Sequence, residues 1–199
     1  MKILTLLLCA VMVVSCTVAG VLAWVIDESR PVVNTFSASR IQINLDESKY
    51  EPSDNSLTTA TRVKTNDNYK MLPGWTLLKD PKVTVEGGSE ACWLFIKLQK
   101  ANEVDKYLEY DIASGWTSLS DEDGVYYREV DKSDSAQGFY ILKENQVKVK
   151  DTVDLAQMNG LIGSGESPQM TFTAYAVQLE KGEGQFSVDE AWTEAQKLG

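Results

Sequence analysis

The chain has 199 residues, a formal net charge of −10 and no histidine. The lack of histidine excludes Ser-His-Asp and Cys-His catalytic groups, histidine-ligated zinc and the HExxH metalloprotease helix. Such an acidic surface repels nucleic acid and anionic membranes. We therefore expect a non-enzymatic protein with no catalytic or metal residues, no cofactor and no nucleic-acid partner.

The N-terminal region has the pattern of an export signal. A single basic residue, Lys2, precedes an uncharged, mostly apolar stretch that covers residues 3–26. A short basic start, an apolar stretch and small residues at its end are typical of a secretory signal peptide. We expect residues 1–23 to be removed after Ala23. The remaining protein is then secreted, and lies outside the cell or on its surface.

Two other interpretations of this region remain open. The uncharged stretch is long enough for an uncleaved anchor, since about 20 apolar residues span a bilayer. Residues 13–16 resemble a bacterial lipobox, in which Cys16 would carry a lipid. We expect membrane contact only through this segment or through a lipid on Cys16.

Cys92 is the one cysteine beyond the expected signal peptide, so the exported part cannot form an internal disulfide. It lies in an apolar run over residues 91–96, which predicts a buried thiol. An exported domain without a disulfide depends on its hydrophobic core. The exported chain is long enough to form one.

Most segments after residue 38 have the polar–apolar alternation that predicts half-buried β-strands. In chain order, we expect these strands at residues 40–46, 59–65, 82–86, 107–112, 125–130, 146–150 and 170–179. Residues 91–98 alternate less and predict a central strand that is buried on both faces. The polar stretch 47–56 predicts a loop.

Turn signals and two short helices complete the pattern. Asp123-Gly124 separates residues 116–119 from the strand at 125–130, as in a hairpin. We expect one helix over residues 152–161, ending near Asn159-Gly160, and another over 187–198 with Ser187 as its N-cap. Many short strands without strand–helix alternation indicate an all-β fold, an antiparallel β-sandwich in one domain over residues 39–199.

The segment 24–38, between the expected cleavage site and the first strand, is the main indication of function. Pro31 is unfavourable in a central strand. The segment is either an edge strand of its own domain or a strand donated to a neighbouring subunit, where it would complete an open sheet edge. Repeated head-to-tail donation produces a filament. The candidate intersubunit residues are Trp24, Val25, Ile26, Val32, Val33 and Phe36.

Residues 22–27 and 33–45 resemble the start of the TasA/camelysin (CalY) family of Gram-positive bacteria, and residues 71–74 and 79–85 resemble that family's next element. The resemblance implies export by the dedicated signal peptidase SipW and a jelly-roll-like sandwich. It also implies extracellular fibres of the biofilm matrix, in which segment 24–38 completes the sheet of the next subunit. Two departures from the family pattern are Val25, where an aromatic residue is usual, and Ser39, where glycine is common.

Other functions remain as alternatives. The family's metallo-endopeptidase label is a distant third choice, because a hydrolytic zinc site without histidine is unusual. Trp75 follows Pro73-Gly74 in a turn and is the best candidate for an exposed contact, whereas we expect Trp93 and Trp116 in the core. The main alternative is therefore a monomeric surface module that binds a glycan or a protein.

Two further features have no firm assignment. The acidic residues 121–123 could bind calcium, although they lack the spacing of an EF-hand loop and a solvated turn is favoured. An Asn–Lys isopeptide crosslink is conceivable, but the sequence does not identify the pair.

Overall fold

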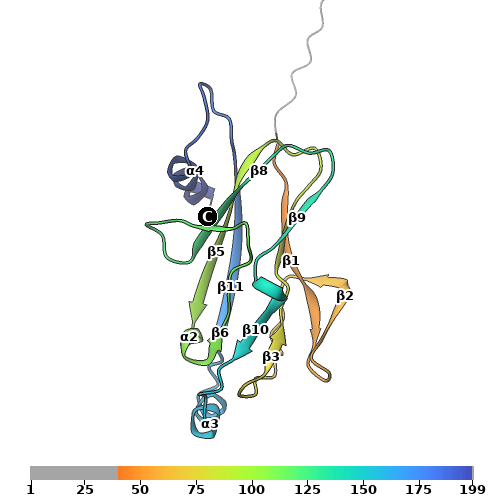
Figure 1. The fold of residues 1–199 in the computed structure, drawn as a ribbon, viewed down its shortest axis with the longest axis vertical. Helices are drawn as coiled ribbons and strands as arrows, with labels where there is room; N and C mark the ends of the chain where they lie inside the picture. Colours follow the sequence, from red (N-terminus) through yellow and green to blue (C-terminus); the bar gives the residue numbers. More distant parts are fainter. Residues whose placement is uncertain (1–39, 199) are drawn as a thin grey trace, which may run out of the picture. The chain divides into compact units, whose positions relative to one another are not determined.

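The computed structural model describes residues 40–198 of the chain. The expected signal peptide (1–23), the lipidation site at Cys16 and the expected donor segment (24–38) lie outside the described residues. Residues 40–198 form mostly antiparallel β-sheet with a few short helices, as Figure 1 shows. The antiparallel pairing agrees with the all-β fold expected from the sequence.

Three sheets are present in the described part of the chain, with strand orders β2-β1-β4-β9, β3-β10-β6 and β11-β5-β8-β7. The strands are β1 (Ile43–Glu51), β2 (Ser56–Val63), β3 (Thr76–Leu78), β4 (Lys82–Val85), β5 (Cys92–Ala101), β6 (Leu108–Glu109), β7 (Thr117–Ser118), β8 (Val125–Val130), β9 (Gln137–Tyr140), β10 (Gln146–Val149) and β11 (Gln169–Gln178). The α-helices are α2 (Val104–Tyr107), α3 (Leu155–Ser164) and α4 (Val188–Ala195).

The prediction of a central strand buried on both faces is confirmed for β5, which lies between β11 and β8. On one face, Leu94 and Ile96 pack against Val83 and Val85 of β4. On the other face, Phe95 lies under α4, in a cluster with Trp192. Successive side chains of a strand point to opposite faces, so an apolar run fits a position between two layers.

A second core lies around the sheet β3-β10-β6. Its centre is formed by Leu77, Leu108 and Val147, and α3 contacts it through Met158 and Leu161. Phe172 of β11 packs against both this core and the core between β4 and β5. The strand β11 therefore borders both hydrophobic regions.

The predicted C-terminal helix is confirmed as α4. The Ser187 side chain accepts a hydrogen bond from the Glu190 backbone N–H, and the Glu190 side chain accepts one from the Ser187 N–H. This reciprocal capping box satisfies two backbone donors at the helix start. The hairpin at Asp123-Gly124 is also confirmed, because β7 pairs with β8 and a Cβ at Gly124 would collide with the Leu98 carbonyl oxygen.

Several predicted boundaries are wrong, and three of these differences change the assignment of a segment. Residues 47–51 belong to β1 and not to a loop, because the polar side chains of Glu47 and Ser48 have buried partners. The strand expected at 107–112 is shorter in the structure, where only Leu108–Glu109 form β6, because Tyr107 is the last residue of α2. The helix α3 starts at Leu155, after the N-cap Asp154, and continues past Gly160 to a left-handed Gly165.

Candidate functional site

One long edge of the sheet β11-β5-β8-β7 is not paired with another strand within residues 40–198. The ten residues of β11 pair with β5 along their whole length, from Gln169 opposite Ala101 to Gln178 opposite Cys92. On its other side, β11 has no partner strand among those described. An unpaired edge presents N–H and C=O groups that can template another strand.

The register determines which residues present these groups. In an antiparallel pair, alternate residues direct both backbone groups toward the same neighbour. The Leu179 N–H donates to the Ala91 carbonyl oxygen (2.8 Å), so the odd-numbered residues of β11 face β5. The backbone groups of the even-numbered residues, among them Met170, Phe172, Ala174 and Ala176, therefore point to the open edge.

The same arrangement occurs at the start of β1, in the facing sheet. The Glu86 N–H donates to the Gln42 carbonyl oxygen (2.8 Å), so even-numbered residues here face β4. The backbone groups of Ile41, Ile43 and Leu45 point away from β4, and β2 pairs with β1 only from Glu47 onward. The Leu45 carbonyl accepts a hydrogen bond from Lys64 Nζ (2.6 Å).

Together these two edges form what we call the open seam. Cα atoms of β1 and β11 come within 8 Å of each other, but no pairing joins the two strands. All six seam side chains are half-buried and pack against fully buried residues such as Leu94. The open seam consists of Ile41, Ile43, Leu45, Phe172, Ala174 and Ala176.

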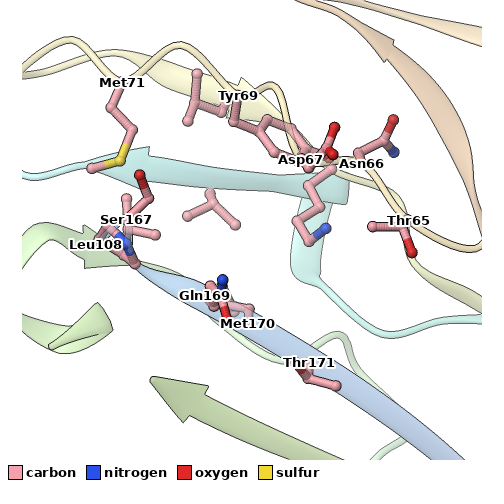
Figure 2. Close-up of a pocket in the computed structure, with 14 residues that line it drawn as sticks. Thr65, Asn66, Asp67, Tyr69, Met71, Leu108, Ser167, Gln169, Met170 and Thr171 are labelled. Atoms are coloured by element: carbon pink, nitrogen blue, oxygen red, sulfur yellow. The ribbon is translucent and has the colours of Figure 1, made fainter. Parts of the chain in front are cut away.

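A pocket of about 360 Å³ continues the open seam past the first residues of β11. Figure 2 shows residues 65–71, which follow β2, on one side of it and the start of β11 on the other. Leu77, Leu108 and Val147 also line it. Met170 belongs both to this pocket and to the open edge, so the pocket and the open edge of β11 are continuous.

Tyr69 forms part of the pocket wall. Its ring stacks on Tyr50 at 4.3 Å between centroids, and Lys79 Nζ lies 5.0 Å from its ring centroid. Burial, with the nearby carboxylates of Glu47 and Asp80, raises the pKa of Tyr69, so its hydroxyl stays neutral. That hydroxyl has no hydrogen-bond partner within residues 40–198.

A buried cluster of charged side chains lies beside the pocket. Asp80 accepts hydrogen bonds from the Ser48 N–H (2.7 Å), the Ser48 hydroxyl (2.7 Å) and Arg62 Nη1 (2.8 Å). Glu47 pairs with Lys79 at 2.6 Å. Every charge in this cluster has a partner, so we assign it a structural role. Sequence reasoning missed it, although Lys79 and Asp80 lie in a stretch that carries the family resemblance.

Trp75 is exposed, with 44% of its surface accessible, on the turn where the sequence places it. It lies beside a shallow cleft of about 370 Å³ that Ser53, Asp54 and Asn55 also line. Trp93 and Trp116 are half-buried. The Trp93 indole donates to the Phe186 carbonyl and the Trp116 indole to the Tyr140 carbonyl, both at 2.8 Å.

The remaining sequence candidates lie apart from the open seam. Cys92 is fully buried, which raises the pKa of its thiol to about 11. Asp121 and Asp123 are exposed, and no group of three acidic or thiol side chains in the described range is arranged to hold a metal ion. Among the described helices, none has the length and apolar character needed to cross a membrane.

One Lys–Asn pair has the proximity that an isopeptide crosslink would need. Lys64 Nζ lies 2.5 Å from Asn44 Oδ1, and Asn44 Nδ2 donates to Asp46 at 2.6 Å. However, Lys64 is exposed and Asp46 is paired with Arg62 at 2.7 Å. An exposed ammonium group is not a nucleophile, so we assign this contact to surface hydrogen bonding.

The described structure does not include the candidate intersubunit residues between Trp24 and Phe36, so their role remains a prediction. Residues 40–198 contain the site that would accept such a strand, which consists of the open seam and its pocket. No family model, curated protein or solved structure matches this chain.

Proposed function

We propose that this protein is a non-enzymatic subunit of an extracellular fibre, as in a biofilm matrix. Its segment 24–36, free after removal of residues 1–23, adds as a strand to the β11 edge of the next subunit. The jelly-roll-like connectivity and the TasA/camelysin relationship belong to this proposal. The observation that carries it is the unpaired edge of β11, where free backbone groups border half-buried apolar side chains.

Antiparallel addition places four of the six apolar candidate residues of the segment on the side of the open seam. In antiparallel addition, donor residues whose backbone groups face β11 also direct their side chains over the open seam. Pro31 lacks an N–H, so it has to face away from β11. That parity directs the even-numbered residues inward: the apolar Trp24, Ile26, Val32 and Phe36, and also the polar Glu28, Arg30 and Asn34. In parallel addition the odd-numbered residues would lie over the open seam instead, among them Val25, Val33, Asp27 and Pro31.

Antiparallel addition also requires a second subunit. It brings Phe36 to the Met170 end of β11, whereas Arg40 of the same chain lies near the other end. The Arg40 carbonyl accepts a hydrogen bond from the Glu90 N–H, and the next residue, Ala91, accepts one from Leu179. Those ends are roughly 30 Å apart at about 3.3 Å per residue. Four residues extend over about 14 Å, so the segment cannot reach this register on its own domain.

We expect a chain that starts at Trp24 to form filaments, and a chain without residues 24–36 to stay monomeric. Electron microscopy and light scattering measure this directly. Within the full exported chain, Ala174→Pro should abolish filaments, because it removes an N–H from the open edge without breaking a hydrogen bond to β5. Ala174→Ser keeps that N–H and should still assemble. If the parent chain remains monomeric at high concentration and across pH, the proposal is wrong.

A second function is favoured by the surface around Trp75. An exposed indole beside the polar residues Ser53, Asp54 and Asn55 has the composition of a site that stacks and hydrogen-bonds a sugar. For a monomeric glycan-binding module, Trp75→Ala should reduce retention on polysaccharide at least tenfold. Tyr140→Ala is the matched control, because this aromatic side chain is about equally exposed (43%) and lies in β9, away from the turn that carries Trp75. Equal retention of both variants would exclude a sugar site at Trp75.

A further inference from the structure

We propose that the pocket at the start of β11 receives the Phe36 ring of the neighbouring subunit and thereby fixes the register of strand addition. This inference rests on the proposed function, and it names the residue and the pocket that determine specificity. Strand addition gains affinity from main-chain hydrogen bonds and specificity from side-chain pockets.

The position of the pocket fits a donor residue opposite Met170. One wall is the start of β11, and the facing wall is the loop 65–71, so the pocket lies on the open-edge side of the strand (Figure 2). A strand hydrogen-bonded to Met170 would direct the side chain of its paired residue into this space. Antiparallel addition brings the C-terminal part of the donor segment, which ends in Phe36, to this end of β11.

The chemistry of the pocket suits an aromatic ring. Two methionines, Met71 and Met170, lie in its walls, and thioether sulfurs make favourable contacts with aromatic rings. Leu77, Leu108 and Val147 supply further apolar surface, and polar residues, among them Asn66, Asp67 and Lys79, line the rest of the pocket. The volume of about 360 Å³ exceeds the roughly 150 Å³ of an apolar cavity that binds benzene. A phenyl ring therefore fits in this pocket.

The same register fixes the pairing further along the strand. With Phe36 opposite Met170, Asn34 lies opposite Phe172, Val32 opposite Ala174 and Arg30 opposite Ala176. Ile26 and Trp24 lie beyond Gln178, the last residue of β11, in this register. Thr35 and Val33 then point away from the open seam, to the opposite face of the sheet. The pairing therefore distinguishes Phe36 from its immediate neighbour, which gives a matched control.

The first test uses the exported chain, residues 24–199, with Phe36→Ala or Thr35→Ala. We expect Phe36→Ala to raise the critical concentration for filament formation at least about tenfold, since a fully buried aromatic side chain is lost. Thr35→Ala should change the critical concentration by less than about twofold. Sedimentation at a series of concentrations measures both values. Equal critical concentrations would overturn the pocket assignment.

The second test is covalent. In the pair Phe36→Cys with Ser167→Cys, the new thiols meet at the pocket of adjacent subunits, so mild oxidation should produce disulfide-linked ladders. Thr35→Cys with Ser167→Cys should give none. The native Cys92 is fully buried and does not interfere. If filaments form but both cysteine pairs give the same ladders, the pocket assignment is refuted and the proposed fibre is not. If the parent chain forms no filaments, the pocket assignment and the proposed fibre are both refuted.

Discussion

Replacing Asp80 with alanine is expected to lower the free energy of unfolding by about 3 kcal/mol. Asp80 is only 4% exposed and accepts three hydrogen bonds, two from Ser48 and one from Arg62. Its removal leaves the Ser48 N–H and hydroxyl buried without an acceptor. Arg62 keeps Asp46 as a partner, so the cost stays below that of a fully isolated buried charge. Urea denaturation followed by tryptophan fluorescence measures the change.

The matched control for Asp80 is an exposed ion pair. Glu90 pairs with Lys132 at 2.9 Å, and both side chains are well exposed. Such pairs contribute little, so Glu90→Ala should change stability by less than about 1 kcal/mol. Asp80→Asn should fall between the two, because it keeps one carbonyl acceptor. Equal stability of the Asp80→Ala and Glu90→Ala variants would show that the buried cluster is not a major source of stability.

The largest expected loss follows from Trp192→Ala, at about 3–5 kcal/mol. Trp192 is 4% exposed and fixes α4 to the outer face of the sheet. Its ring lies 5.3 Å from the Phe95 ring and 5.6 Å from the Tyr175 ring, between centroids. The alanine variant leaves a cavity between α4, β5 and β11 that the sheet cannot close. Thermal and urea unfolding should both detect it.

Trp75→Ala is the control for this substitution, because it removes the same side chain from an exposed turn. Surface substitutions of this kind usually stay within about 0.5 kcal/mol. Similar losses for the two variants would mean that α4 contributes little to the domain. Because Tyr175 belongs to β11, a loosened α4 should also weaken the edge strand, and Trp192→Ala filaments should dissociate at lower urea concentration.

Periodicity located the elements with the clearest patterns. The apolar run around Leu94 became the central strand β5, residues 125–130 became β8, and Ser187 caps the last helix. Each of these depends on neighbouring residues alone, through face alternation or capping. The exposure of Trp75 also followed from local turn chemistry.

The remaining features depend on contacts between distant segments. Residues 47–49 are polar, and the partners that bury Glu47 and Ser48 in a strand are Lys79 and Asp80, about 32 positions away. The open seam could not be predicted either, since the direction of a backbone N–H depends on which strand pairs on the other side. The pocket at Met170 joins residues about 100 positions apart, a proximity that no local pattern contains.

The open edge of β11 differs from the edges that soluble proteins usually expose. Its sequence, residues 169–178, contains no charged residue and no proline. Charges and prolines on edge strands are the common protection against aggregation, and uncharged β-rich segments readily stack into amyloid-like sheets. A filament built by strand donation always leaves one such edge uncovered, on its terminal subunit. In the proposed filament the two ends would therefore be chemically different. Other extended chains would bind at the end with the uncovered edge, and a short capping peptide bound there would stop growth.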